Sequence, residues 1–260
     1  MSAALLRAEA VSVRLGAALV VDRVDLTLPA GELVALVGPN GAGKTTLVRA
    51  LAGLIPAQGQ ISLDGQPLQS WPARDRARRI AYLPQGHAFH WPLAVAAVVA
   101  LGRVPHGDPF ANLSEADGAA VRRALGVTAT EAFADRLVTT LSGGERARVA
   151  LARALATDAK ILLADEPTMS LDPRHQLVVM DLLRQAAHAG SAVLAVLHDL
   201  ALAARFADRV VVMDRGRLVA DAAPARALDP ARLAAVFGVE ATMVEIGGHA
   251  VPIPQRALGG

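Results

Sequence analysis

The chain has 260 residues, of which 26 are basic and 24 acidic, so its formal net charge is only +2. This near balance, together with an aromatic content of 3%, argues against a nucleic-acid partner. With 53% hydrophobic residues the chain can bury a core, and the absence of cysteine excludes disulfides and thiolate metal sites.

The N-terminal segment predicts an antiparallel sheet at the edge of the molecule. Two mixed, strand-like segments, Leu6–Leu15 and Leu19–Leu28, are separated by Gly16, which favours a turn. A third short strand, Ile61–Leu63, is expected between two glycine-containing turns.

Four apolar runs predict parallel strands that are covered on both faces. They are Leu33–Val37, Ile161–Ala164, Ala192–Leu197 and Val210–Met213. Helical stretches are expected between them, among them Lys44–Leu54, Glu145–Ala156 and His175–Ala189. This alternation favours an α/β fold with a largely parallel sheet.

Between residues 87 and 157 the strand signal is absent, and helical stretches take its place. They are Leu93–Leu101, Ser114–Leu125 and Glu145–Ala156. The longest apolar run, Leu93–Leu101, is far shorter than the about 20 residues of a membrane-spanning helix, so no membrane span is expected. We expect one domain over residues 1–240, with a helical subdomain at about 87–157 inserted into it. Residues 241–260 are expected to form a short C-terminal tail, preceded by a helix near Ala231–Phe237.

The strongest motif directly follows the first apolar run and reads G-x-x-x-x-G-K-T. It consists of Gly38, Pro39, Asn40, Gly41, Ala42, Gly43, Lys44 and Thr45, with Thr46 next in the chain. Gly41 and Gly43 allow backbone N–H groups to converge on phosphate oxygens, and the following helix points its positive end at the same charge. Lys44 is expected to reach the β- and γ-phosphates, and Thr45 to ligate Mg²⁺. The motif therefore predicts ATP and Mg²⁺ as ligands.

Two adjacent acids follow the apolar run Ile161–Ala164. Asp165 is expected to hold Mg²⁺, and Glu166 to polarise the attacking water as general base. Two carboxylates at the end of a buried strand are costly unless a cation lies beside them. A solvated acidic pair is the alternative interpretation, and the phosphate-binding motif makes it the weaker one.

A third motif, Leu141-Ser142-Gly143-Gly144-Glu145, precedes a predicted helix. A serine and two glycines at a helix N-terminus form a second anion site. One phosphate group needs only one such loop, so we expect two chains to share each nucleotide, each contributing a different loop.

Together these motifs resemble the ATP-binding subunits of ATP-binding cassette (ABC) transporters, over about residues 5 to 240. The resemblance implies a P-loop NTPase core with an antiparallel β edge subdomain and an inserted α-helical subdomain. The family's signature loop matches Ser142, Gly143, Gly144 and Glu145.

Three further positions take their expected roles from this resemblance. It implies that Gln85 contacts Mg²⁺ and senses the transmembrane partner, and that His198 contacts the γ-phosphate. The D-loop of the family corresponds to Ser170, Leu171 and Asp172. One position departs from the family, which often has an aromatic residue that stacks on adenine where this chain has Leu15. Leu15 is therefore expected to give the base an apolar contact without stacking.

The segment Val99–His106, which reads V-A-L-G-R-V-P-H, narrows the resemblance to importers of iron–siderophores, haem and vitamin B12. This implies a homodimeric ATPase subunit with Glu166, His198 and Lys44 as catalytic residues. The implied partners are transmembrane permease subunits and, indirectly, a periplasmic or extracellular substrate-binding protein. No signal peptide is recognisable, and the expected location is peripheral, on the cytoplasmic face of the inner membrane.

Alternatives remain at this point. A soluble ABC-type ATPase, for example in iron–sulfur assembly, would carry the same motifs. A small-molecule kinase would use the phosphate loop but leaves Ser142–Glu145 unexplained. The basic run Arg74–Arg79 is expected to form a solvated helix face rather than a lipid-binding one. His87 and His90 are expected to lie in a loop or interface, because no carboxylate or cysteine completes a metal site.

Overall fold

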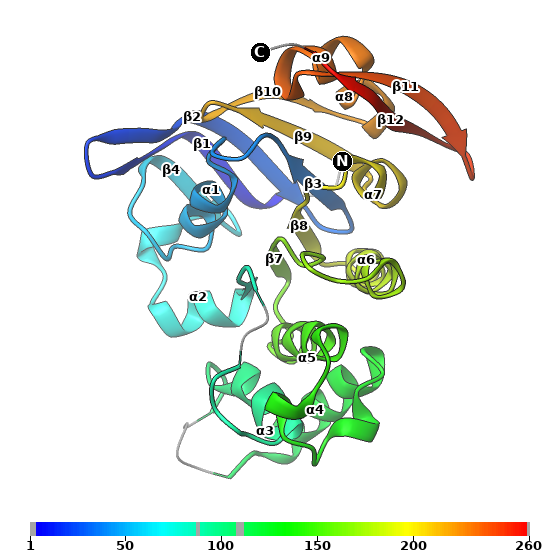
Figure 1. Cartoon of the computed structure of the whole chain (residues 1–260). Helices are drawn as coiled ribbons and strands as arrows, with labels where there is room; N and C mark the ends of the chain where they lie inside the picture. Colours follow the sequence, from blue (N-terminus) through cyan, green and yellow to red (C-terminus); the bar gives the residue numbers. More distant parts are fainter. Residues whose placement is uncertain (1–3, 87–88, 108–111, 259–260) are drawn as a thin grey trace.

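The computed structural model describes residues 4–86, 89–107 and 112–258. Figure 1 shows a central sheet with an antiparallel sheet beside it, a group of helices at one end and a C-terminal β-hairpin at the other. This is the α/β architecture that the sequence predicts.

The central sheet has six strands in the order β10-β9-β3-β8-β7-β6. They are β3 (Leu33–Val37), β6 (Ile80–Leu83), β7 (Ile161–Asp165), β8 (Ala192–Val196), β9 (Arg209–Asp214) and β10 (Arg217–Ala222). All neighbours pair in parallel except the edge strand β10, which is antiparallel to β9. Every residue of β3, β7 and β8 is buried, which explains their continuous apolar sequences and confirms the predicted parallel strands.

The predicted edge sheet is also present. Its order is β2-β1-β4-β5, and all its pairs are antiparallel. Its strands are β1 (Ala4–Leu15), β2 (Ala18–Pro29), β4 (Gln58–Leu63) and β5 (Gln66–Pro67). This sheet and helix α1 (Lys44–Leu51) enclose one hydrophobic cluster against the central sheet, which includes Leu26, Leu47 and Leu194.

Helices cover the other face of the central sheet. Helices α5 (Gly143–Leu155), α6 (Pro173–His188) and α7 (Leu200–Phe206) contribute Leu151, Val179 and Leu202 to a second cluster with the sheet. Aspartates cap two of these helices: Asp172 accepts from a backbone N–H of α6, and Asp199 accepts from two backbone N–H groups of α7. These caps fix the points at which the chain leaves the edge of the sheet.

A third cluster holds together the helices α3 (Val95–Ala100), α4 (Glu115–Val127) and α5. They form the group at the lower end of Figure 1. The cap of α4 is as predicted, because Ser114 Oγ accepts from the backbone N–H of Asp117 at 3.1 Å. Helix α3 starts later than the predicted Leu93, since Ala94 forms an isolated antiparallel bridge with Leu137. Helix α2 (Ala73–Arg79) lies between β5 and β6 in the chain.

The C-terminal region differs from the prediction of a short tail over residues 241–260. Helices α8 (Pro224–Ala227) and α9 (Pro230–Phe237) are followed by an antiparallel hairpin of β11 (Val239–Ile246) and β12 (His249–Ala257). Buried side chains of the hairpin, Ala241 and Val251, join the cluster that includes α7. The helix expected near Ala231–Phe237 is present as α9.

Within the three described stretches of the chain, no helix combines the length and the apolar character that crossing a membrane requires.

Candidate functional site

The carboxyl ends of four neighbouring strands bring predicted site residues to one edge of the central sheet. Strand β3 leads into the phosphate loop (Gly38–Thr45), β8 is followed by His198, β7 ends at Asp165 before Glu166, and β6 precedes Gln85. These strands are parallel and adjacent, so their carboxyl ends share one edge. This is the edge at which open α/β sheets bind ligands.

The backbone of the phosphate loop packs closely against the backbone of the neighbouring strands β9 and β2. A Cβ on Gly38 would lie 2.1 Å from a carbonyl oxygen of β9, and one on Gly43 would lie 2.6 Å from a carbonyl oxygen of β2. Gly43 also has a φ of 101°, which a side chain would strain. The loop ends at Lys44, where α1 begins, so the unpaired N–H groups of the first helical turn lie at the loop.

Lys44 folds back over the phosphate loop. Its side chain is nearly buried, and Nζ donates to Gly38 O at 2.7 Å and Pro39 O at 2.9 Å. Burial lowers the pKa of its ammonium group from 10.5, while the charges of Glu166 and Asp165 act to raise it. The ammonium group therefore lies where it can exchange carbonyl oxygens for phosphate oxygens.

Asp165 is completely buried at the end of β7. Its Oδ1 accepts from Thr45 Oγ1 at 3.0 Å, and its Oδ2 accepts from Tyr82 OH at 3.3 Å. Burial raises the pKa of this carboxyl above 3.8, although both hydroxyl hydrogen bonds act to lower it. A buried carboxylate whose hydrogen-bond donors are neutral is a group that a cation would stabilise.

The oxygen atoms at this point fit Mg²⁺. This ion prefers hydroxyl, carboxylate, water and phosphate oxygens and usually takes only one or two protein carboxylates. The Thr45 hydroxyl and the Asp165 carboxylate supply that chemistry side by side. In the described ranges no group of three or more His, Cys, Asp or Glu side chains could hold a metal. Gln85, the third predicted ligand, uses its amide nitrogen to bind Glu166.

Glu166 joins two of the other predicted residues. Its Oε1 lies 2.6 Å from His198 Nε2, and its Oε2 accepts from Gln85 Nε2 at 2.8 Å. The backbone of Glu166 has a φ of 52°, in the left-handed region that non-glycine residues rarely occupy. This turn directs the carboxylate away from β7 and toward the two donors. A carboxylate oriented in this way can accept a proton from water once a donor moves aside.

The signature loop (Ser142–Glu145) forms a reciprocal cap at the start of α5. Ser142 Oγ accepts from Glu145 N at 3.3 Å, and Glu145 Oε2 accepts from Ser142 N at 2.7 Å. The bond from the Ser142 backbone lowers the pKa of the Glu145 carboxyl. Among the described residues, no hydrogen bond or ion pair joins this loop to the phosphate loop.

The predicted D-loop connects this edge of the sheet to α6 and lies against the signature loop. Ser170 has a φ of 60°, Leu171 is buried, and Asp172 caps α6. Asp172 Oδ2 lies 2.7 Å from His175 Nδ1, which holds the imidazole ring beside Gly144. A Cβ on Gly144 would lie 2.4 Å from this ring, so the second glycine of the signature loop is also a packing requirement within the chain.

An open groove of ≈ 430 Å³ links the three loops on this face. Its lining comes from the residues after Gln85, the signature loop and the D-loop: Gly86, Phe89, Thr139, Gly143, Arg146, Met169, Ser170 and Leu171. The structure thus brings the signature loop to the D-loop rather than to the phosphate loop.

The remaining predicted positions lie around this edge. Leu15 ends β1 and is 51% exposed, and the neighbouring strand β2 touches the phosphate loop at Gly43. Thr46 lies half-buried in the first turn of α1. His90 is exposed, whereas His87 lies outside the described residues.

Three side chains at the site have no role in the sequence-based prediction. Tyr82 donates a hydrogen bond to Asp165, and His175 packs on Gly144. The Tyr82 side chain also raises the pKa of the nearby Arg49 guanidinium group. Tyr82 is the only tyrosine of the chain and precedes Gln85 by three residues. His175 lies three residues after Asp172, a spacing that is typical of a helix N-cap and the residue whose backbone N–H it accepts from.

Comparison with known sequences gives matches along most of the chain. Residues 21–169 match the family model described as ABC transporter. The Hemin import ATP-binding protein HmuV of Streptomyces coelicolor is 48% identical over 226 residues, which are 86% of this chain and 80% of the relative. The protein of the same name from Rhodopseudomonas palustris is 45% identical over 262 residues, covering 97% and 95% of the two chains.

Solved structures show the same architecture. One, described as an inward-facing conformation of a metal-chelate type ABC transporter, has a TM-score of 0.84 at 25% identity and covers 97% of this chain and 98% of that chain. Another is the dimeric post-hydrolysis state of the ATP-binding cassette MJ0796 bound to ADP and Pi. It has a TM-score of 0.73 at 26% identity and covers 84% and 98% of the two chains.

Proposed function

Because the chain belongs to the ABC transporter family of ATPases, we propose that it is the ATP-hydrolysing subunit of an importer for haem or a related iron chelate. Two relatives that are 45–48% identical are named as hemin import proteins, which supports haem or a related iron chelate as the substrate class. Such relatives favour an importer over the soluble assembly factor and the small-molecule kinase. The observation that carries the hydrolytic role is the carboxylate of Glu166, held between Gln85 and His198 beside the phosphate loop.

The chain's own groups suffice to bind and orient the nucleotide. The N–H groups of the phosphate loop and the Lys44 ammonium group would bind the β- and γ-phosphates. Thr45 and Asp165 would hold Mg²⁺, which when bound offsets the negative charge of the phosphates. Lys44 would then exchange the carbonyl oxygens of Gly38 and Pro39 for phosphate oxygens.

Hydrolysis requires Glu166 to exchange its present partners. His198 is exposed for nearly half of its side-chain surface, so its ring is free to turn from Glu166 to the γ-phosphate. The freed carboxylate oxygen then accepts a proton from water while that water's oxygen attacks the γ-phosphorus and the bond to ADP breaks. His198 and Lys44 stabilise the charge on the transferred group.

A second copy of the chain would complete each site. In the described part of the chain the signature loop makes no hydrogen bond or ion pair with the phosphate loop, and its Ser142 and Gly143 are exposed. In a head-to-tail dimer it would reach the γ-phosphate bound by the partner. The dimeric state of the MJ0796 cassette supports this arrangement.

Permease subunits would bind the surface that follows Gln85. Large apolar side chains are exposed along this stretch, which is typical of an interaction surface. They are Trp91 at 75%, Leu93 at 41%, Leu101 at 49% and Val104 at 43% exposure. The chain would thereby lie peripherally on the cytoplasmic face of the inner membrane and act with an external substrate-binding protein through the permease.

A pull-down of the tagged chain from native membranes in mild detergent tests this proposal. We expect a polytopic membrane protein to co-purify in stoichiometric amount. Vesicles that contain the purified complex should then take up hemin when ATP is supplied to the face carrying the chain. Full ATPase activity in a fraction without any membrane protein would overturn the proposal. Uptake of a ferric siderophore or cobalamin but not hemin would overturn its substrate class alone.

A further inference from the structure

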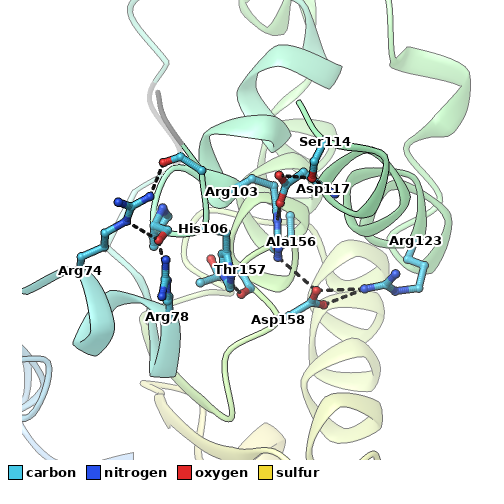
Figure 2. A network of polar contacts seen from close by, with 12 residues as sticks. Arg74, Arg78, Arg103, His106, Ser114, Asp117, Arg123, Ala156, Thr157 and Asp158 are labelled. Atoms are coloured by element: carbon cyan, nitrogen blue, oxygen red, sulfur yellow. Dashed lines mark hydrogen bonds and ion pairs between the residues drawn. The ribbon is translucent and has the colours of Figure 1, made fainter. Parts of the chain in front are cut away.

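A network of polar contacts joins the end of α3 to the junction between α5 and β7 (Figure 2). At its centre lies Arg103, which is 8% exposed. Its Nε donates to Asp117 Oδ1 at 2.8 Å, and its Nη1 donates to Ala156 O at 2.7 Å and to Asp158 Oδ2 at 3.1 Å. One guanidinium group thus ties the 3₁₀ turn Leu101–Arg103 to α4 and to the α5–β7 junction.

The two carboxylates of this network are themselves held in place. Asp117 Oδ2 accepts from Ser114 Oγ at 2.6 Å, and Arg123 Nη2 contacts both oxygens of Asp158 at 3.0 Å. Asp158 also has a φ of 52°, so its backbone turns sharply between α5 and β7. A guanidinium group offers a planar set of donors that a lysine ammonium group cannot reproduce. The contacts of Arg103 are therefore specific to arginine.

Two further contacts fix the 101–107 segment to the same junction. His106 Nε2 lies 2.8 Å from Thr157 O, and both residues are labelled in Figure 2. A Cβ on Gly102 would lie 2.2 Å from Arg153 O, so the backbone of the segment packs directly on the last turn of α5. Gly102, Arg103 and His106 of the sequence motif thus all contact the last turn of α5 or the two residues that follow it.

The outer side of the segment is held by α2. Arg74 donates to Pro105 O at 2.9 Å and to Gly107 O at 2.5 Å, and Arg78 donates to Pro105 O at 2.7 Å. Helix α2 has no buried residue, so these contacts add to the solvated helix face that the sequence predicts for the arginine run. Helix α2 leads directly into β6 and Gln85, so the 101–107 segment lies between two elements that run to the nucleotide edge.

The α5–β7 junction connects two parts of the proposed machinery. Helix α5 carries the signature loop at its other end, about 20 Å away for a helix of this length. Strand β7 begins directly after the junction and ends at Asp165. A displacement of the junction therefore moves the loop offered to the partner's nucleotide and the acids at the chain's own nucleotide.

We propose that Arg103 is a positioning residue through which a permease bound at the 101–107 segment sets the placement of the signature loop and of the catalytic acids. Leu101 and Val104 are exposed on either side of Arg103 in the sequence and give the permease its contact. This inference rests on the proposed function, because it needs a permease.

Arg103→Lys tests the proposal, since it keeps the buried positive charge and removes the planar set of donors. ATPase activity is measured for the isolated chain and for the complex with the co-purified permease in lipid nanodiscs. We expect the stimulation by the permease to fall at least about fivefold, the lower end of the usual range for coupling between sites. The activity of the isolated chain and the KM for ATP should each stay within about twofold of the wild type.

Arg123→Gln is the matched control, because it removes the other arginine contact of Asp158 without touching the 101–107 segment. It should leave the stimulation unchanged. The double variant Arg74→Ala/Arg78→Ala loosens the segment from the exposed side of α2 and should lower the stimulation even if Arg103→Lys fails to fold.

Two results would overturn the inference. Equal losses in the isolated chain and in the complex would make Arg103 a purely structural residue, and unchanged stimulation in all variants would give it no role in coupling. If no permease co-purifies with the wild type, the proposed function fails as well. If the wild-type complex is intact and the variants keep the full stimulation by the permease, the role of Arg103 is overturned and the proposed function stands.

Discussion

Asp165 and Glu166 are neighbours in sequence with different environments. Asp165 completes a buried strand and is bound by two hydroxyl groups, whereas Glu166 turns in the left-handed region toward His198 and Gln85. The residue types and their place after an apolar run could be predicted from the sequence. The partners could not, because Gln85 and Glu166 are 81 residues apart and meet only through the pairing of β6 with β7.

The buried carboxyl of Asp165 gives a pH-dependent prediction. Since burial raises its folded pKa above the unfolded value, ionisation costs stability, and the cost grows as the pH rises through the folded pKa. Asp165→Asn should raise the Tm of the nucleotide-free chain at pH 7 by about 2–4 °C, the shift that 1 kcal/mol causes in a domain of this size. Calorimetry should show the gain shrinking as the pH is lowered toward 3.8. A gain that does not depend on pH, or a loss at pH 7, would contradict this assignment.

At the scale of elements, the parallel strands with continuous apolar runs could be predicted, and several strands at the periphery, among them β6, β10 and β12, could not. Strand β6 has only four residues, and β10 alternates exposed and half-buried positions with charged side chains among them. Strand β12 contains Pro252 and Pro254, which suggest a loop. They fit because, among the strands that the structure describes, β12 pairs with β11 alone, so the other edge of β12 needs no ladder hydrogen bonds.

The contact between α5 and α6 distinguishes the two glycines of the signature loop. Gly144→Ala should lower the free energy of unfolding by about 1–3 kcal/mol, because the new methyl group overlaps the His175 ring. Gly143→Ala is the control, since a Cβ there meets no atom within 4 Å. Urea denaturation compares the two variants, and His175→Ala should restore much of the stability of Gly144→Ala. Equal destabilisation by both alanines would show that this contact is unimportant.

At the scale of the whole molecule, the inserted helical group could be predicted from the missing strand signal between residues 87 and 157, without knowledge of the strand order. The motifs themselves indicate the phosphate loop, the acids and the signature loop. Their arrangement depends on the order β3-β8-β7-β6, which no local pattern contains. Nor does a local pattern reveal that residues 239–257 cover α7, because the hairpin contributes few large buried side chains.

Removal of residues 239–260 should therefore destabilise the whole molecule. The truncated chain loses the burial of Val251 and Ala241 and exposes part of the cluster around Phe206, at a cost of about 2–4 kcal/mol. Thermal unfolding of the full and truncated chains measures this effect. An unchanged Tm would mean that the segment is a dispensable tail.

In the proposed function, two chains share each ATP and Glu166 drives its hydrolysis. The test is to measure the mass of the Glu166→Gln variant by light scattering after size-exclusion chromatography, with and without Mg²⁺ and ATP. ATP turnover is measured on the same samples. We predict a dimer of two 26.9-kDa chains that forms only with ATP, and turnover reduced by about 10²- to 10⁴-fold, the usual effect of losing a general base. A variant that stays monomeric with ATP and hydrolyses it at a near-normal rate would contradict the account.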